Sequence, residues 1–139
     1  MINADKKQLL KIINEKQVYT FDAIKYLSGE NNDGKNDSKG FFKLSDDEKV
    51  QLIAWILNNL KKVKYYSKYN TSYGIKNIFK KSALGFYVYG GAFKEAMLIC
   101  GFEVKDVRDE NWIFNVSDAC CKELNTRYFK NKKEGWQVL

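Results

Sequence analysis

The sequence predicts an α+β fold that is mostly helical, with a winged-helix-like C-terminal module and an N-terminal helical piece. Three observations predict this class. Apolar residues recur at helical spacing behind residues that commonly begin helices. Two short β-prone runs lie in the second half of the chain. The elements there follow one another as helix, helix, strand, helix, strand and helix, which is the outline of a winged helix.

The chain of 139 residues suits one main domain, and its hydrophobic fraction of 45% is enough for a core. We expect an N-terminal helical piece at residues 1–27, with a first helix capped by Asp5 and a short second helix at 21–27. Residues 28–40 have no apolar side chain, which predicts an exposed polar loop or linker. Residues 41–139 would then form the winged-helix-like domain.

A capping box marks the start of the first helix of this domain. Ser45 is followed three residues later by Glu48, so the side chain of each can bond to the backbone amide of the other. Apolar residues then recur at helical spacing as far as Val63. The predicted last turn is rich in cations that would complement the negative end of the helix dipole. These cations are Lys61, Lys62 and Lys64.

The later elements are indicated by caps, glycines and alternation of apolar residues. Ser72 is a candidate cap for the next helix, Gly85 interrupts the chain after it, and Gly101 is placed to end a third helix. The predicted elements are a helix at 72–81, a strand at 86–89, a helix at 92–100, a strand at 112–116 and a helix from 117 or 118 to about 129. A largely polar tail would follow.

Several classes of function lack their usual residues. The chain has no histidine, the most common general base, and no phosphate-loop or nucleophile motif, so we expect no enzyme and no small-molecule substrate. Its three cysteines form no Cys-x-x-Cys pair, which argues against a disulfide framework, a metal site or another cofactor. Without a secretory signal or an apolar run of membrane-spanning length, a cytoplasmic location is expected and no membrane partner.

The positive charge is concentrated in the second half of the chain. Residues 1–60 carry equal numbers of basic and acidic side chains, so residues 61–139 carry the whole net charge of +7. No acidic residue occurs between Glu48 and Glu95, although lysines and tyrosines are frequent there. A lysine-rich composition alone explains the many lysines but not the missing acids. The asymmetry therefore predicts an anionic partner.

Lysines interleaved with tyrosines suit a nucleic-acid surface, because lysines neutralise phosphates and tyrosine rings stack on exposed bases. The alternative is that the lysines are merely solvated and that Tyr65, Tyr73 and Tyr87 are partly core. The third predicted helix offers little for reading a DNA groove beyond its lysine and glutamate. The residues expected to bind nucleic acid or a partner are Lys61, Lys62, Lys64, Tyr65, Tyr66, Lys68, Tyr69, Lys76, Lys80, Lys81 and Lys94.

One part of the chain resembles a group of small phage, plasmid and genomic-island proteins of Gram-positive bacteria. Their pattern runs SYGLKH, YV, FKxAM, GF and NWxF, and the matching segments here are 70–79, 86–88, 93–97, 101–102 and 111–114. Two positions depart from the group: Asn77 stands where it often has histidine, and Tyr89-Gly90 where it often has Thr-Asn or Ser-Asn. Residues 1–60 lie outside the resemblance.

The resemblance implies a non-enzymatic counter-defence protein in a bacterial host cell. Its partner would be a host nuclease or nucleoprotein, such as a guide-loaded CRISPR nuclease, which makes it an anti-CRISPR-type inhibitor. The alternative is a DNA-binding accessory or regulatory protein of a phage or plasmid, built on a winged-helix-like module. The two hypotheses differ in one expectation: the accessory protein would bind naked DNA, and the counter-defence protein would bind it only weakly.

Overall fold

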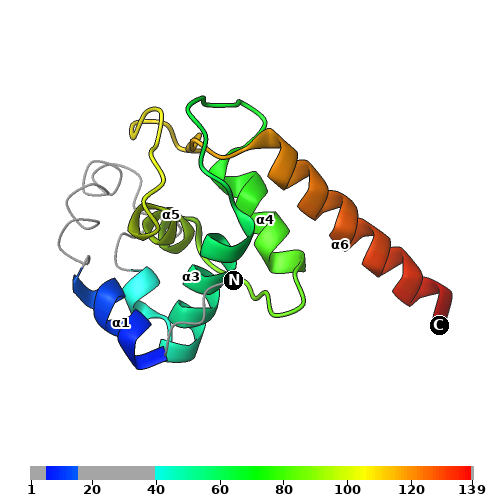
Figure 1. The fold of residues 1–139 in the computed structure, drawn as a ribbon, viewed down its shortest axis with the longest axis horizontal. Coiled ribbons are helices and arrows are strands. Elements are labelled where there is room, and N and C mark those ends of the chain that lie inside the picture. The colour runs from blue at the N-terminus through cyan, green and yellow to red at the C-terminus, as the bar shows by residue number, and fades with distance from the viewer. Residues whose placement is uncertain (1–5, 16–39, 139) are drawn as a thin grey trace.

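The computed structural model describes residues 6–15 and 40–138, and this part of the chain is mostly helical, as predicted (Figure 1). Its helices are α1 (Lys6–Glu15), the short 3-10 helix η1 (Phe41–Lys43), α3 (Asp46–Asn59), α4 (Ser72–Lys81), α5 (Gly90–Ile99) and α6 (Asp118–Val138). The predicted helix at 21–27 and residues 28–39 of the predicted linker lie outside the described residues.

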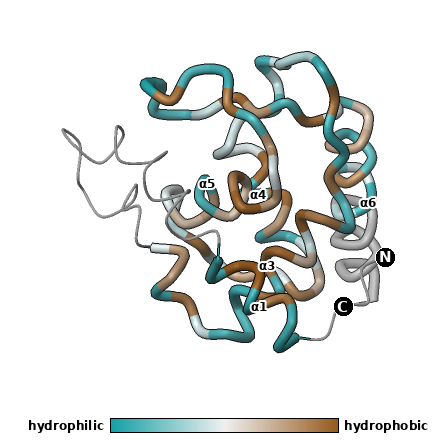
Figure 2. Tube along the Cα trace, turned by 60° about the vertical axis from the view of Figure 1, so that its left-hand side comes forward, coloured by the Kyte–Doolittle hydropathy of each residue, from teal (hydrophilic) through white to brown (hydrophobic). Residues whose placement is uncertain are grey.

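Helix α5 is the central helix of the core. Its sequence is apolar on nearly all sides, which favours burial of the whole helix. Residues 91–97 and Ile99 are all buried, and η1, α3 and α4 pack against it. Figure 2 shows hydrophobic segments of α3 and α4 in the middle of the body and hydrophilic colour over much of the loops. Because α5 has so little exposed surface, it cannot serve as the groove-reading helix of a winged helix.

The capping box at the start of α3 is confirmed. The Ser45 hydroxyl accepts a hydrogen bond from the Glu48 amide at 3.2 Å, and the Glu48 carboxylate accepts one from the Ser45 amide at 3.0 Å. Helix α1 packs against α3 and buries Leu9 and Ile13. This packing places α1 on the same core as the main domain.

The predicted C-terminal end of this helix is wrong. Helix α3 ends at Asn59, and its last turn holds no basic residue. Lys62 instead forms an isolated antiparallel bridge with Val116, and the Val63 amide donates to the Asn115 carbonyl at 3.0 Å. Pairing with a segment far along the chain outweighs the helical periodicity here, so Lys61, Lys62 and Lys64 lie in a connector and not on a helix.

The two predicted strands do not form a wing. Residues 112–116 make only isolated bridges, to residues 62 and 71 on one side and to Val104 on the other. Residues 85–89 take part in no bridge within the described parts of the chain. Both edges of the 112–116 segment are therefore occupied by other segments, which leaves none for 86–89. The predicted alternation is still visible as burial, because Val88 is buried and Tyr87 and Tyr89 are exposed.

The termini of the other helices differ slightly from the predictions. Thr71, and not Ser72, caps α4, because its hydroxyl accepts from the Gly74 amide at 3.2 Å. Helix α5 begins at Gly90, two residues earlier than predicted. Gly101 ends it with φ of 85°, and the amides of Gly101 and Phe102 donate to carbonyls of the last turn, as in a Schellman motif.

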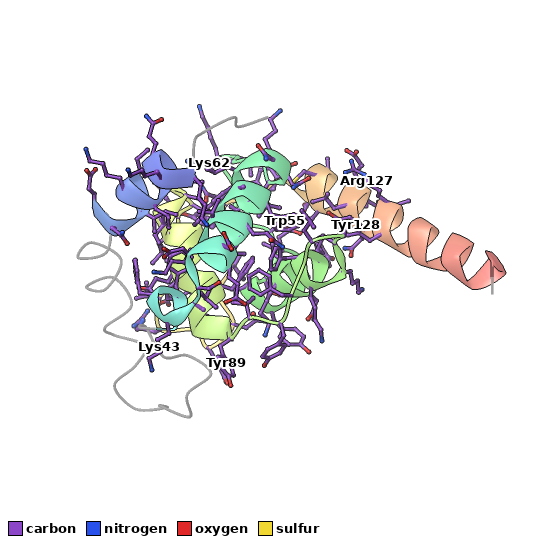
Figure 3. All side chains as sticks on the ribbon, turned by 90° about the horizontal axis from the view of Figure 1, so that it is seen from below. Lys43, Trp55, Lys62, Tyr89, Arg127 and Tyr128 are labelled. Carbon is purple, nitrogen blue, oxygen red and sulfur yellow. The ribbon has the colours of Figure 1, made fainter. Side chains whose placement is uncertain are left out.

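Helix α6 continues to Val138, beyond its predicted end at about residue 129, and projects away from the body (Figure 1). Its first half packs against α4 and buries Cys121 and Leu124, and the Tyr128 hydroxyl accepts a hydrogen bond from the Trp55 indole at 3.1 Å. Figure 3 shows the side chains of Trp55 and Tyr128 pointing toward each other. None of the helices described has both the length and the apolar character required to cross a membrane.

Candidate nucleic-acid interface

The structure divides the predicted binding residues into three places. Seven lie in the connector between α3 and α4, which we define as residues 60–71. Three lie on α4, and the last, Lys94, lies on the buried helix α5. Figure 3 shows Lys62 of the connector and Tyr89, which precedes α5, on opposite sides of the body. Of the predicted residues, Lys76, Lys80 and Lys94 line one groove, and the connector residues do not line it.

The connector presents its lysines to solvent but uses two of its tyrosines in the fold. Lys61, Lys62, Lys64 and Lys68 are exposed. The Tyr65 hydroxyl accepts from the Asp118 amide at the start of α6, and the Tyr66 hydroxyl donates to Glu103. Partial burial and the Glu103 carboxylate raise the pKa of Tyr66. Tyr69, which is 78% exposed, is the connector ring best placed to stack on a partner.

The most structured part of the basic surface is a groove along α4, which we name the α4 groove. It has a volume of about 480 Å³. Its lining residues are Ser72, Tyr73, Lys76, Asn77, Lys80, Tyr87, Gly90, Lys94, Glu110 and Asn111. The groove therefore brings together residues of α4, the segment before α5, α5 itself and the loop before residue 112. Three lysines and one glutamate give it a positive balance of charge.

The rim of the α4 groove alternates cations and aromatic rings. The ammonium group of Lys76 lies 5.5 Å from the ring centre of Tyr73 and 5.2 Å from that of Tyr87. Lys80 lies 5.6 Å from the Tyr87 ring centre. Such cation–π contacts hold long side chains in place over the rings. Tyr73 and Tyr87 are themselves mostly exposed, so the interpretation of these two rings as core is wrong.

Lys94 lies at the floor of the groove, because it lines the groove and is nevertheless only 2% exposed. Its ammonium group donates to the Glu110 carbonyl at 2.5 Å and lies 5.1 Å from the ring centre of Trp112. Burial lowers the pKa of Lys94 to about 8, and the nearby Glu110 carboxylate acts in the opposite direction. Lys94 stays a predicted binding residue, but only a group that enters the groove can reach it.

Asn111 fixes the wall of the groove to the start of α4. Its side-chain oxygen accepts hydrogen bonds from the Ser72 hydroxyl and from the Tyr73 amide, both at 3.0 Å. The Ser72 hydroxyl in turn accepts from the Trp112 amide at 3.1 Å. These bonds join positions about forty residues apart and hold Tyr73 beside the loop that carries Glu110.

The sequence prediction omitted several groove residues. Tyr73 could have been found, because it lies three positions before Lys76 and so shares a helix face with it. Asn77, singled out above only as a departure from a pattern, lines the same groove. Tyr87, Glu110 and Asn111 come from separate segments, and no local pattern places them beside α4. Lys81 is exposed but does not line the groove.

Comparison with known proteins returns no matching family model, no matching curated protein and no matching solved structure.

Proposed function

We propose that this chain is a non-enzymatic nucleic-acid-binding protein of a mobile genetic element that acts in counter-defence. It contacts the nucleic acid of a host nucleoprotein through the α4 groove and the exposed lysines of the connector. The observation that supports nucleic-acid binding is the α4 groove, in which lysines are held beside exposed tyrosine rings. The proposed role in counter-defence rests on the resemblance of residues 70–116 to small phage, plasmid and genomic-island proteins. The partner we propose is a guide-loaded CRISPR nuclease.

The groove favours exposed bases over a closed duplex. Lysines neutralise phosphates of any nucleic acid, and this contribution carries no sequence information. Tyr73 and Tyr87 expose most of their ring surface, which is available for stacking on bases that are not already stacked in a helix. A nucleoprotein that carries RNA or an opened DNA strand offers both phosphates and accessible bases.

The second candidate is a DNA-binding accessory or regulatory protein of the same kind of element. It is favoured by the position of α4, a surface helix whose last turn carries the exposed Lys80 and Lys81. In this case α4, and not the buried α5 of the predicted winged-helix pair, would face the DNA backbone. Of the winged-helix-like module predicted from the sequence, this second candidate keeps the helix pair α4 and α5 without the wing.

The two candidates differ in their binding to naked DNA. We would measure binding of the full chain to a labelled random duplex, a single strand and a guide-loaded CRISPR nuclease, at about 50 and about 200 mM salt. Counter-defence predicts tight binding to the loaded nuclease and inhibition of its cleavage, with weak binding to naked duplex. Tight duplex binding at low salt that collapses at high salt would favour the accessory protein.

Charge reversal in the groove tests the interface itself. The double variant Lys76→Glu with Lys80→Glu should weaken binding about ten-fold or more, because it replaces two phosphate contacts with repulsion. The matched control is Lys105→Glu with Lys122→Glu, which makes the same change in net charge at exposed positions outside the groove. If the two double variants weaken binding equally, net charge is responsible and the α4 groove is not the interface.

A further inference from the structure

The α4 groove has the size of a binding site for a small ligand. A continuous strand could bind along a flat basic surface and would not need such a pocket. Its volume of about 480 Å³ lies within the range of pockets that enclose small molecules. An internal phosphate of a strand is tethered on both sides and passes over a surface. A terminal phosphate has a free side and can enter far enough to approach the buried Lys94.

The charges in the groove suit a doubly charged anion. The charged residues that line the groove are three lysines, Lys76, Lys80 and Lys94, and one carboxylate, that of Glu110. At neutral pH Lys94 remains largely protonated, since its pKa is about 8. The start of α5 adds a positive partial charge, because Gly90 lines the groove and the Tyr89 side chain forms no cap to this ten-residue helix. A phosphomonoester carries close to two negative charges at this pH.

The rings at the rim supply a place for the base. Tyr73 is 63% exposed and Tyr87 is 57% exposed, although each contacts the ammonium group of Lys76. A base stacked on either ring would cover apolar surface that water now contacts, and every base has a face that can stack. Ser72, Asn77 and Asn111 add hydroxyl and amide groups between the rim and the floor.

We propose that the α4 groove binds a nucleoside monophosphate group, with its phosphate directed toward Lys94 and its base stacked at the tyrosine rim. This inference rests on the proposed function and names the part of the nucleic acid that the groove receives. The group can come from two sources, a free nucleotide or the 5′-phosphorylated end of a single strand. In both, the phosphate carries the extra charge that an internal phosphodiester lacks.

The first experiment uses the full chain with AMP, adenosine and inorganic phosphate as separate probes in calorimetry. AMP should bind more tightly than either of its parts. In Lys94→Met, which keeps a side chain of similar shape, AMP affinity should fall about ten-fold or more, because a charge-assisted hydrogen bond is lost. Lys122→Met is the control for the change in net charge and should bind AMP like the unaltered chain.

A second variant separates the base from the phosphate. Tyr87→Ala should weaken the binding of AMP more than the binding of inorganic phosphate. The base loses its stacking surface, whereas the phosphate loses only the cation–π support of Lys76 and Lys80 and keeps Lys94. If Lys94→Met proves poorly folded by circular dichroism, Lys80→Met takes its place at the same groove. Equal affinity for AMP and inorganic phosphate, or unchanged AMP affinity in a folded lysine variant, would overturn the proposal.

The two sources are distinguished with a short single-stranded oligonucleotide that carries either a 5′-phosphate or a 5′-hydroxyl. A preference for the phosphorylated end supports the strand as the source, and AMP binding without such a preference supports the free nucleotide. If neither AMP nor the phosphorylated end is preferred while salt-dependent strand binding persists, this inference fails and the proposed function stands. If the chain binds neither AMP, nor the phosphorylated end, nor any strand, both this inference and the proposed function are overturned.

Discussion

A lysine as deeply buried as Lys94 loses most of its hydration, which contacts within the protein must replace. Its ammonium group bonds to the Glu110 carbonyl and faces the Trp112 ring. Burial lowers the pKa of Lys94 to about 8, although the Glu110 carboxylate acts in the opposite direction. A buried cation retained at a free-energy cost in the floor of a groove is more readily explained by a ligand than by stability.

The Lys94→Met variant should change how stability depends on pH. In the folded chain the pKa of Lys94 is about 8, against 10.5 in the unfolded chain, so between these values the unfolded state binds more protons. The free energy of unfolding contributed by Lys94 therefore rises with pH, by about 2 kcal/mol from pH 7 to pH 10. Lys94→Met removes this rise. Urea unfolding of both proteins at pH 7, 8.5 and 10 measures the difference between them.

Lys76, Lys80, Tyr73 and Tyr87 also line the groove. They are present in both proteins, so the comparison cancels most of their contribution. Parallel pH profiles for the two proteins would mean that Lys94 is not buried as the structure has it.

At the scale of elements, the turn after α4 depends on a glycine. A Cβ at position 85 would lie 1.9 Å from the Phe79 carbonyl oxygen and 3.0 Å from the Lys80 carbonyl carbon, and both atoms belong to the backbone of α4. Gly85→Ala must therefore move the turn that leads to Tyr87 and the groove. We expect a loss of about 2–3 kcal/mol in the free energy of unfolding.

Gly74→Ala is the matched control for this substitution. Its Cβ would approach the Thr71 hydroxyl at 3.3 Å, while alanine within α4 gains helix propensity. The two effects oppose each other, so the change in unfolding free energy should stay within about 1 kcal/mol. Similar losses for the two variants in urea unfolding would show that the turn tolerates a side chain at position 85.

The elements that sequence predicted well are those fixed by neighbours along the chain. Ser45 and Glu48 determine the start of α3 through bonds that span three residues, and helical periodicity places Ile75 and Phe79 in the core. The end of α3 was wrong because it depends on pairing with residues 115–117, which no local pattern contains. For the same reason, no local pattern indicates that residues 86–89 lack a partner strand.

The same distinction between local and long-range contacts applies to the candidate site. The lysines and tyrosines of one surface helix follow from helical spacing, whereas the groove needs Tyr87, Glu110 and Asn111 from segments that pack beside it. The burial of Lys94 was not predicted, because a lysine is normally a surface residue and the apolar residues around it on α5 are what bury it. Burial of a charge is a tertiary property and leaves no local pattern in the sequence.

At the scale of the whole molecule, the connector and the α4 groove raise the question of whether one strand contacts both. Lys61→Gln with Lys64→Gln removes two exposed charges and leaves the backbone pairing of the connector in place. If both lysines contact phosphates of a single strand, the slope of log affinity against log salt should become shallower by about 1.4. Binding titrations across a series of salt concentrations measure this slope.

An unchanged slope would exclude Lys61 and Lys64 from the interface. A control with Lys105→Gln and Lys122→Gln shows how much of any change comes from net charge alone, because both side chains are exposed at other positions.

The bonds of Asn111 also bear on when the groove can form. They join positions 39 residues apart, and the Asn70 amide reaches the Val116 carbonyl across 46. Contacts of such separation form late, because closing a long loop reduces chain entropy before the contact is gained. During synthesis, α3, α4 and α5 leave the ribosome before residue 111. A nascent chain therefore carries the lysines and tyrosines of the groove before it has the wall that positions them, and the groove is completed only after Glu110 and Asn111 have emerged.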